Sequence, residues 1–300
     1  MHKTDKNIYR ASNLELLRIF SMVFIIMHHY FVHGNFQLEN TEVHLPLVWV
    51  QLISILGKLG VNCFILITGY FMVTSKFKLL SILKIIIEVI FYSITITFVI
   101  YGLGIMDVNL NVLLMSILPI HFEMYWFATT YIVLYILTPF LNIFIKNISK
   151  RQLIKLILVL IILWSIFPMI VMPAVSFSVL GWFILVYFIA AYIRLSNSSF
   201  EKNWSYYLKL FCFLYVLLIM SVLLFDLCSI KFTFLRAYAT YYSGMNRFIV
   251  LLMSISLFLT FKNLNIKYNR LINNIATTIF GVYLIHDHVL MRDFFMEDFI

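Results

Sequence analysis

The sequence predicts an all-α, polytopic transmembrane helix bundle of about nine spans, and two observations carry this prediction. Hydrophobic residues make up 63% of the 300-residue chain and charged residues only 12%, whereas soluble domains are about 45–50% apolar and about 25% charged. Long apolar runs also recur along the chain, separated by short polar or basic segments. Because a backbone in lipid must satisfy its own hydrogen bonds, such runs indicate helices that cross a bilayer.

A short basic head (Lys3, Lys6 and Arg10) precedes the first apolar run, which has no small-residue cleavage site. We therefore expect a retained span rather than a removed signal peptide. The seventh span is expected to start between Lys202 and Lys209 and to end near Asp226. The other expected spans cover about residues 12–34, 47–73, 79–104, 124–145, 153–172, 178–195, 247–261 and 274–291.

The connections between these spans differ in charge. Lys76 and Lys78, the basic residues from Lys146 to Lys155, and those from Lys262 to Arg270 all fall on one predicted side. Cytoplasmic loops carry an excess of Lys and Arg, so we expect the N-terminus in the cytoplasm of a multi-pass cell-membrane protein. The formal net charge of +9 has the same origin, and without a clustered basic face it does not indicate a nucleic-acid partner.

The first span carries ionisable residues within an apolar run: Glu15, Arg18, His28 and His29. At about 100° per residue, the eleven-residue step from Arg18 to His29 brings both side chains onto one helix stripe, about 16 Å apart along the axis. Glu15 joins that stripe three residues before Arg18 and can pair with it. Intramembrane charges are costly, so they normally face a partner or a wet cavity. This stripe is the predicted functional site.

Four stretches, taken together, resemble the acyltransferase 3 family of integral-membrane O-acyltransferases. They are Asn13–Arg18 followed by His29, Gly60–Phe71, Trp126–Phe127 with Tyr131–Asn142, and Phe280–Asp287. The last has the form common among Gram-positive sugar acetyltransferases, and Thr68 stands where the family more often has Ser. The resemblance runs through nearly the whole chain, which we treat as a single integral-membrane domain over residues 1–300.

The resemblance implies acyl transfer to a hydroxyl, and the first-helix stripe suits that chemistry. A hydroxyl is a poor nucleophile at neutral pH, and a histidine can accept its proton in the transition state. His29 is the predicted base, with His28 as the alternative base and a purely structural His29 as the second alternative. Arg18 offers a planar fork for a phosphate or a developing oxyanion, unless it serves only as the buried partner of Glu15.

Other residues receive supporting roles. The family has a basic motif thought to meet the donor's phosphates, and Lys76 and Lys78 stand at that place, although the positive-inside bias explains them equally well. Asn62 and Trp126 belong to the family-like stretches and are expected to support the site or its substrate. His286 and Asp287 suggest an oriented pair, although neighbours on a helix face apart.

Family members usually have ten spans with both termini inside, whereas we expect nine here. Residues 292–300 are too few for another crossing. Either the natural chain ends one helix short or the sequence has been cut. A missing helix would leave His286 and Asp287 facing lipid or a partner subunit, so an oligomer stays possible.

The resulting hypothesis is an enzyme that moves an acyl group, most simply acetyl from acetyl-CoA, to a hydroxyl of a cell-envelope or exported polysaccharide or its lipid-linked precursor. Its partners are then acyl-CoA, the glycan and membrane lipid. With no metal-ligand spacing and no nucleophile elbow, we expect no metal, no permanently bound cofactor and no covalent serine chemistry; an acyl-histidine intermediate stays open. The alternative is a transporter or flippase, whose intramembrane ionisable residues would relay protons or bind substrate.

The charge pattern makes a topology prediction. Reporter fusions at Lys150 and Lys267 should report the cytoplasm, and fusions near Gln37 and Tyr238 should report the outside, because Lys and Arg concentrate on the first pair's side. A reporter active only on one side of the membrane measures this. A cytoplasmic signal at Tyr238 would overturn the assignment of the seventh and eighth spans.

Overall fold

The computed structural model describes residues 11–33, 45–105, 107–170 and 177–292, and within these ranges the chain is helical with no strand. The first half contains α1 (Ser12–His33), α2 (Leu45–Met72), α3 (Leu79–Gly102), α4 (Leu110–Ile117) and α5 (Trp126–Asn147). The middle contains α6 (Lys150–Ile161), a π-helical turn (Ile162–Ile166), α7 (Phe167–Ile170) and α8 (Val179–Leu195). The last part contains a 3-10 turn (Asn197–Phe200), α9 (Trp204–Ser229), two further 3-10 turns (Thr233–Tyr238 and Tyr241–Ser243), α10 (Phe248–Asn263) and α11 (Arg270–His286).

Each of the nine expected apolar runs forms a helix, and the all-α membrane bundle is confirmed. Six helical segments of the described chain are long and apolar enough to cross a membrane. They are Leu47–Met72, Leu79–Gly102, Trp126–Asn147, Lys150–Ile170, Trp204–Ser229 and Thr233–Asn263. Helix α8 is apolar but shorter, and α1 and α11 are not among the six. The count of nine crossings therefore stays a prediction.

The fifth run is helical through Pro168 to Ile170, and its expected end at about residue 172 lies outside the described residues. A π-helical turn precedes the proline, and Asn246 donates its side-chain amide to the carbonyl of Trp164 at 3.0 Å. Proline has no N–H to reach that carbonyl, so the side chain replaces the missing bond. The expected bounds of the ninth run, about 274–291, are wrong, because α11 ends at His286 and residues 289–292 form a separate helical turn after Asp287 and His288. Pro173 lies outside the described residues.

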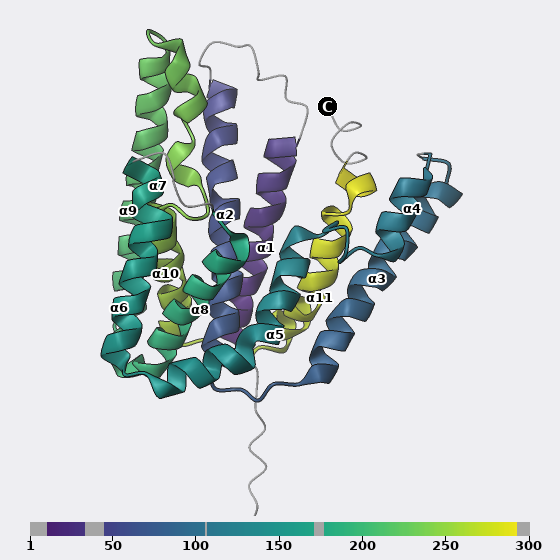
Figure 1. Ribbon diagram of the computed structural model, residues 1–300. Coiled ribbons are helices and arrows are strands. Elements are labelled where there is room, and N and C mark those ends of the chain that lie inside the picture. Colours follow the sequence, from purple (N-terminus) through teal and green to yellow (C-terminus); the bar gives the residue numbers. More distant parts are fainter. Residues whose placement is uncertain (1–10, 34–44, 106, 171–176, 293–300) are drawn as a thin grey trace, which may run out of the picture.

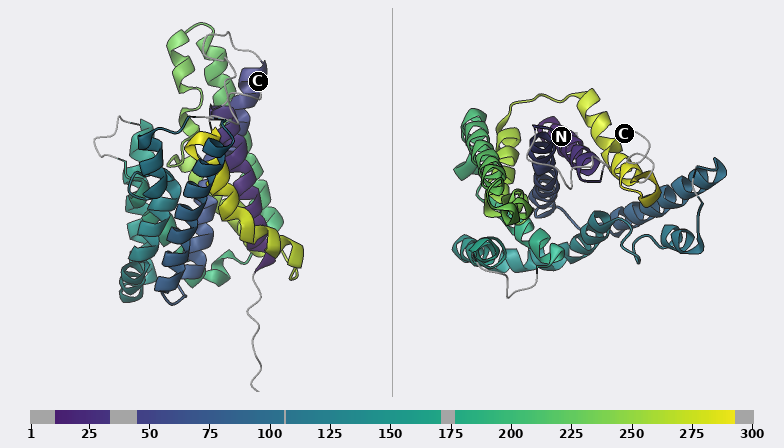
Figure 2. Two further views of the ribbon diagram at one scale, coloured as in Figure 1. Left: turned by 90° about the vertical axis from the view of Figure 1, so that its right-hand side faces the viewer. Right: turned by 90° about the horizontal axis from the view of Figure 1, so that it is seen from above.

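Helices α1 and α2 lie inside the bundle, with α8, α10 and α11 packed around them (Figure 1; Figure 2, right). Their close approach depends on glycine: a Cβ on Gly60 would lie 2.6 Å from the backbone oxygen of Ser21, and one on Gly57 would meet the ring of His28. In lipid, van der Waals packing and hydrogen bonds between helices drive their association, and small residues let the backbones approach closely enough for that packing. Helix α3 lies at the edge, with many large apolar side chains exposed.

Gly60→Ala should lower the stability of the bundle, because the new Cβ would meet backbone that cannot rotate away. Overpacking of this kind costs about 1–3 kcal/mol, which thermal unfolding of the purified protein in detergent would detect as a lower midpoint. Gly102→Ala is the matched control, since a Cβ on Gly102 would have nothing within 4 Å. Equal midpoints for the two variants would refute this account of the packing.

Candidate functional site

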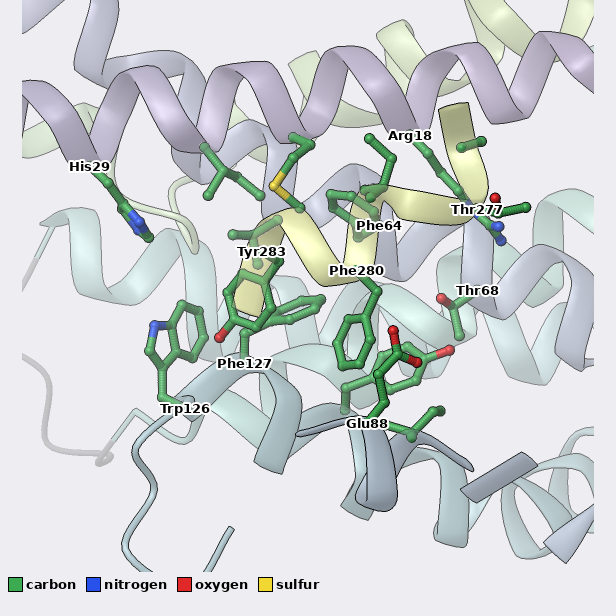
Figure 3. A pocket seen from close by; sticks show the side chains of 17 residues that line it. Arg18, His29, Phe64, Thr68, Glu88, Trp126, Phe127, Thr277, Phe280 and Tyr283 are labelled. Carbon is green, nitrogen blue, oxygen red and sulfur yellow. The ribbon is translucent and has the colours of Figure 1, made fainter. Parts of the chain in front are cut away.

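A cavity of about 400 Å³ opens between α1, α2, α3, α5 and α11 (Figure 3). This volume falls in the range of small-ligand sites, about 300–1,000 Å³. Most of its walls are aromatic or aliphatic, and its ionisable lining residues are Arg18, His29 and Glu88, beside the tyrosines 131 and 283. Arg18 and His29 project from α1 towards opposite ends of the cavity (Figure 3). The stripe expected on the first helix therefore faces one shared cavity.

Arg18 and Glu15 form the expected pair. Nη1 of Arg18 lies 3.2 and 3.3 Å from the two carboxylate oxygens of Glu15, whose side chain is buried. Helical spacing of three residues places the two groups one turn apart on the same face. The pair offsets the cost of a carboxylate inside the bundle, while the guanidinium still lines the cavity. Structural and ligand-binding roles of Arg18 are thus compatible.

His29 contacts both residues that end the last helix. Its Nδ1 lies 3.1 Å from Nε2 of His286 and 3.3 Å from Oδ1 of Asp287. Nδ1 of His286 lies 2.9 Å from the carbonyl of Val282, one turn earlier, and must carry a proton to bond there. Nε2 of His286 is then an acceptor in the neutral ring, so we assign the proton of His29 to Nδ1. The lone pair of neutral His29 is therefore on Nε2.

Asp287 lies at the C-cap of α11, where the chain leaves the helix. Its carboxylate has no exposed surface, and Oδ1 accepts from Nη2 of Arg292 at 2.6 Å and from Nε at 3.1 Å. Lys58 of α2 also interacts electrostatically with this carboxylate. Asp287 is buried and does not face lipid, and it meets His286 at the ring of His29; the functional role expected of this pair stays a prediction. The helix ends one residue before it, and the turn brings both side chains to His29.

His28, the alternative base, is placed differently from His29. Its Nδ1 donates to the backbone carbonyl of Ser54 at 2.6 Å, and its Cβ packs against Gly57 of α2. It does not line the cavity. This geometry favours a role in fastening α1 to α2.

Of the remaining predicted residues, Trp126 lines the cavity, whereas Asn62, Lys76 and Lys78 do not. The supporting role of Trp126 stays a prediction. Asn62 is fully buried away from the cavity: the amide accepts from Nε1 of Trp182 at 2.9 Å and donates to the carbonyl of Met245 at 3.0 Å, which ties α2 to the helices behind it. Lys76 and Lys78 are exposed in the connection from α2 to α3, at the end of the bundle where α1 begins (Figure 1).

His29, His286 and Asp287 could also serve as metal ligands, since one ligand atom from each lies within 4.8 Å of the others. The charges around them argue against that use. Arg292 already occupies Oδ1 of Asp287, and Lys58 adds a second positive charge to the same carboxylate. A divalent ion would have to share one carboxylate with two cations. We therefore interpret the cluster as a hydrogen-bonded network.

Several cavity and network residues were not predicted as site residues: Lys58, Thr68, Glu88, Tyr131, Thr277, Tyr283 and Arg292. A signal existed for two of them. Glu88 and Lys58 are charged residues within otherwise apolar runs, a pattern that marks functional positions in membrane helices. Nothing in the sequence alone indicated which wall of the bundle they face.

A family model described as an acyltransferase domain, that of the acyltransferase 3 family, matches residues 12–296. No curated protein and no solved structure matches the chain. The match includes every helix that lines the cavity, from α1 to α11.

Arg292→Gln should destabilise the protein, because it leaves the buried Asp287 carboxylate without its closest cation. Removing one member of a buried pair costs about 3–5 kcal/mol. The midpoint of thermal unfolding should fall strongly in Arg292→Gln. It should fall less in the double variant Asp287→Asn/Arg292→Gln, which also removes the charge of the carboxylate. Losses that simply add in the double variant would show that the two groups do not depend on each other.

Proposed function

The chain belongs to the acyltransferase 3 family, whose members are O-acyltransferases, and from this premise we propose that it moves an acetyl group from acetyl-CoA to a hydroxyl of a cell-envelope or exported polysaccharide, or of its lipid-linked precursor. One observation supports the mechanism above all others. His29 lines the cavity while its Nδ1 is held by Asp287 and His286. A base oriented in this way presents Nε2 to the substrate hydroxyl.

In this mechanism Nε2 of His29 accepts the proton of the acceptor hydroxyl as its oxygen attacks the thioester carbonyl. The carbon–sulfur bond then breaks, and the imidazolium returns the proton to the departing thiolate. Asp287 stabilises the imidazolium and holds the ring in the productive tautomer. Arg292 keeps Asp287 ionised and in place. These steps need no group beyond the donor and the acceptor.

Arg18 is assigned to the donor's phosphates rather than to the reacting carbonyl. It lies on the same helix as His29 but about 16 Å from it along the axis, and towards the other end of the cavity (Figure 3). A group that far away cannot donate to an oxyanion beside His29, because such donors act at about 3 Å. Its planar fork fits phosphate well.

The proposed orientation agrees with this assignment. With the N-terminus in the cytoplasm of a cell-membrane protein, Arg18, Lys76 and Lys78 lie towards the side that holds acyl-CoA, and His29 lies towards the outside. The donor would then enter from the cytoplasm, and the glycan would reach the opposite end. We retain Lys76 and Lys78 as a surface basic patch that attracts the donor.

His29→Ala should reduce acyl transfer by a factor of about 10²–10⁴, the usual contribution of a general base, with membrane abundance near that of the parent. The measurements are transfer by purified protein and the O-acyl signals of envelope glycan by NMR. His28→Ala is the comparison variant: His28 packs against α2 and does not line the cavity, so its loss should lower the thermal midpoint but retain most of the transfer that His29→Ala loses.

If His29→Ala transfers the acyl group at the parent rate and His28→Ala does not transfer it, His28 is the general base instead of His29. Suppose that the purified parent protein transfers no acyl group and that cells without the protein keep every O-acyl signal. Those two results would support the transporter or flippase alternative over the acyltransferase.

A further inference from the structure

Glu88 lies on α3, a helix apolar enough to cross a membrane, and its carboxylate lines the cavity. The proposed chemistry at His29 gives this carboxylate no role. Glu88 projects into the cavity from α3, opposite α1 (Figure 3). Among the described residues its side chain has no hydrogen bond or ion pair, and Glu88 is the only carboxylate in the cavity wall. A charged side chain at the centre of a membrane helix costs about 2.5–3.5 kcal/mol on insertion scales, and such residues normally mark a functional site.

The depth of Glu88 narrows the choice of ligand group. Helices α1 and α3 begin at the same end of the bundle (Figure 1). At 1.5 Å per residue, Arg18 lies about 9 Å and His29 about 26 Å from the start of α1, and Glu88 lies about 14 Å from the start of α3. Figure 3 likewise shows Glu88 between Arg18 and His29 along the cavity. A group that joins an anion at Arg18 to a reacting carbonyl at His29 therefore runs along the cavity that Glu88 lines.

We propose that Glu88 is a specificity-determining residue that accepts hydrogen bonds from the amide N–H groups of the donor's pantetheine arm. This inference rests on the proposed function, in which acyl-CoA phosphates meet Arg18 and the thioester meets His29. The arm between those two groups is linear and carries two secondary amides. An amide N–H placed in a mostly apolar cavity is costly unless it is bonded, and an ionised carboxylate is an acceptor for it.

The nearby polar side chains complete this section of the cavity. Thr68 and Tyr131 line it together with Glu88, and their hydroxyls can serve the amide carbonyls as donors. Thr277 also lines it, but its hydroxyl donates to the carbonyl of Asn274 at 2.6 Å. Towards His29 the wall becomes aromatic, with Trp126, Phe127 and Tyr283. The polar side chains of the cavity therefore lie beside the proposed position of the arm, next to Phe280, and the wall beside the small acyl group is aromatic.

The test measures donor and acceptor KM values separately for the purified full-length protein. Glu88→Leu should raise the KM for acetyl-CoA about 10- to 100-fold, the range expected for losing a charge-assisted hydrogen bond, with kcat and acceptor KM unchanged. S-acetylpantetheine should show the same ratio between variant and parent, because it keeps both amides. Glu88→Gln, which keeps a carbonyl acceptor, should show a smaller rise.

Lys84→Gln is the matched control, since Lys84 is exposed one turn earlier on α3 and does not line the cavity. It should leave every constant unchanged. If Glu88→Leu does not fold, Glu88→Gln still decides the question through its donor KM. An unchanged donor KM, a change confined to the acceptor KM, or a fall in kcat alone would overturn the proposal.

Stabilisation by free CoA separates this inference from the proposed function. CoA should raise the thermal midpoint of the parent protein, and should do so less for Glu88→Leu. A parent protein that CoA does not stabilise and that transfers no acetyl group would refute the proposed function itself. Stabilisation of parent and variant to the same degree, with transfer intact in both, would refute only the role of Glu88.

Discussion

The ion pair between Asp287 and Arg292 is the interaction on which the outer end of the cavity depends. One carboxylate oxygen accepts from Arg292 and lies within 3.3 Å of Nδ1 of His29. The carboxylate is fully buried, and a buried charge persists only where partners compensate for its lost hydration. Arg292 and Lys58 supply that compensation, so the carboxylate can stay ionised beside the imidazole that it orients.

A second constraint is the close approach of α1 and α2. Gly57 and Gly60 leave no room for side chains between these helices, which places His28 against α2. Adjacent residues on a helix differ by about 100° in direction, so fastening His28 to α2 turns His29 away from that interface and into the cavity. The packing of two helices thereby sets the direction of the base.

Several residues in the family-like stretches serve the scaffold rather than the cavity. Asn13 donates its amide to the carbonyl of Phe261 at 3.0 Å, at the C-terminal end of α10, where helix carbonyls lack partners. Asn62 joins α2 to Trp182 and Met245. Both are buried or partly buried amides between helices, where hydrogen bonds hold the bundle together. A motif in a membrane enzyme can therefore mark a helix contact as readily as a reactive group.

The sequence by itself determined the membrane helices, the pairing of Glu15 with Arg18 and the shared face of Arg18 and His29, because hydrophobicity and the 3.6-residue period act within one segment. It also singled out His286 and Asp287, but not their common contact with His29. Only the tertiary structure decided that contact, the pairing of Asp287 with Arg292, the burial of Asp287 and the place of Glu88 in the wall. These features depend on the residue at which α11 ends. They also depend on how α1, α3 and α11 are rotated about their axes and shifted along them relative to one another. No local period encodes those quantities; they follow from packing the whole bundle.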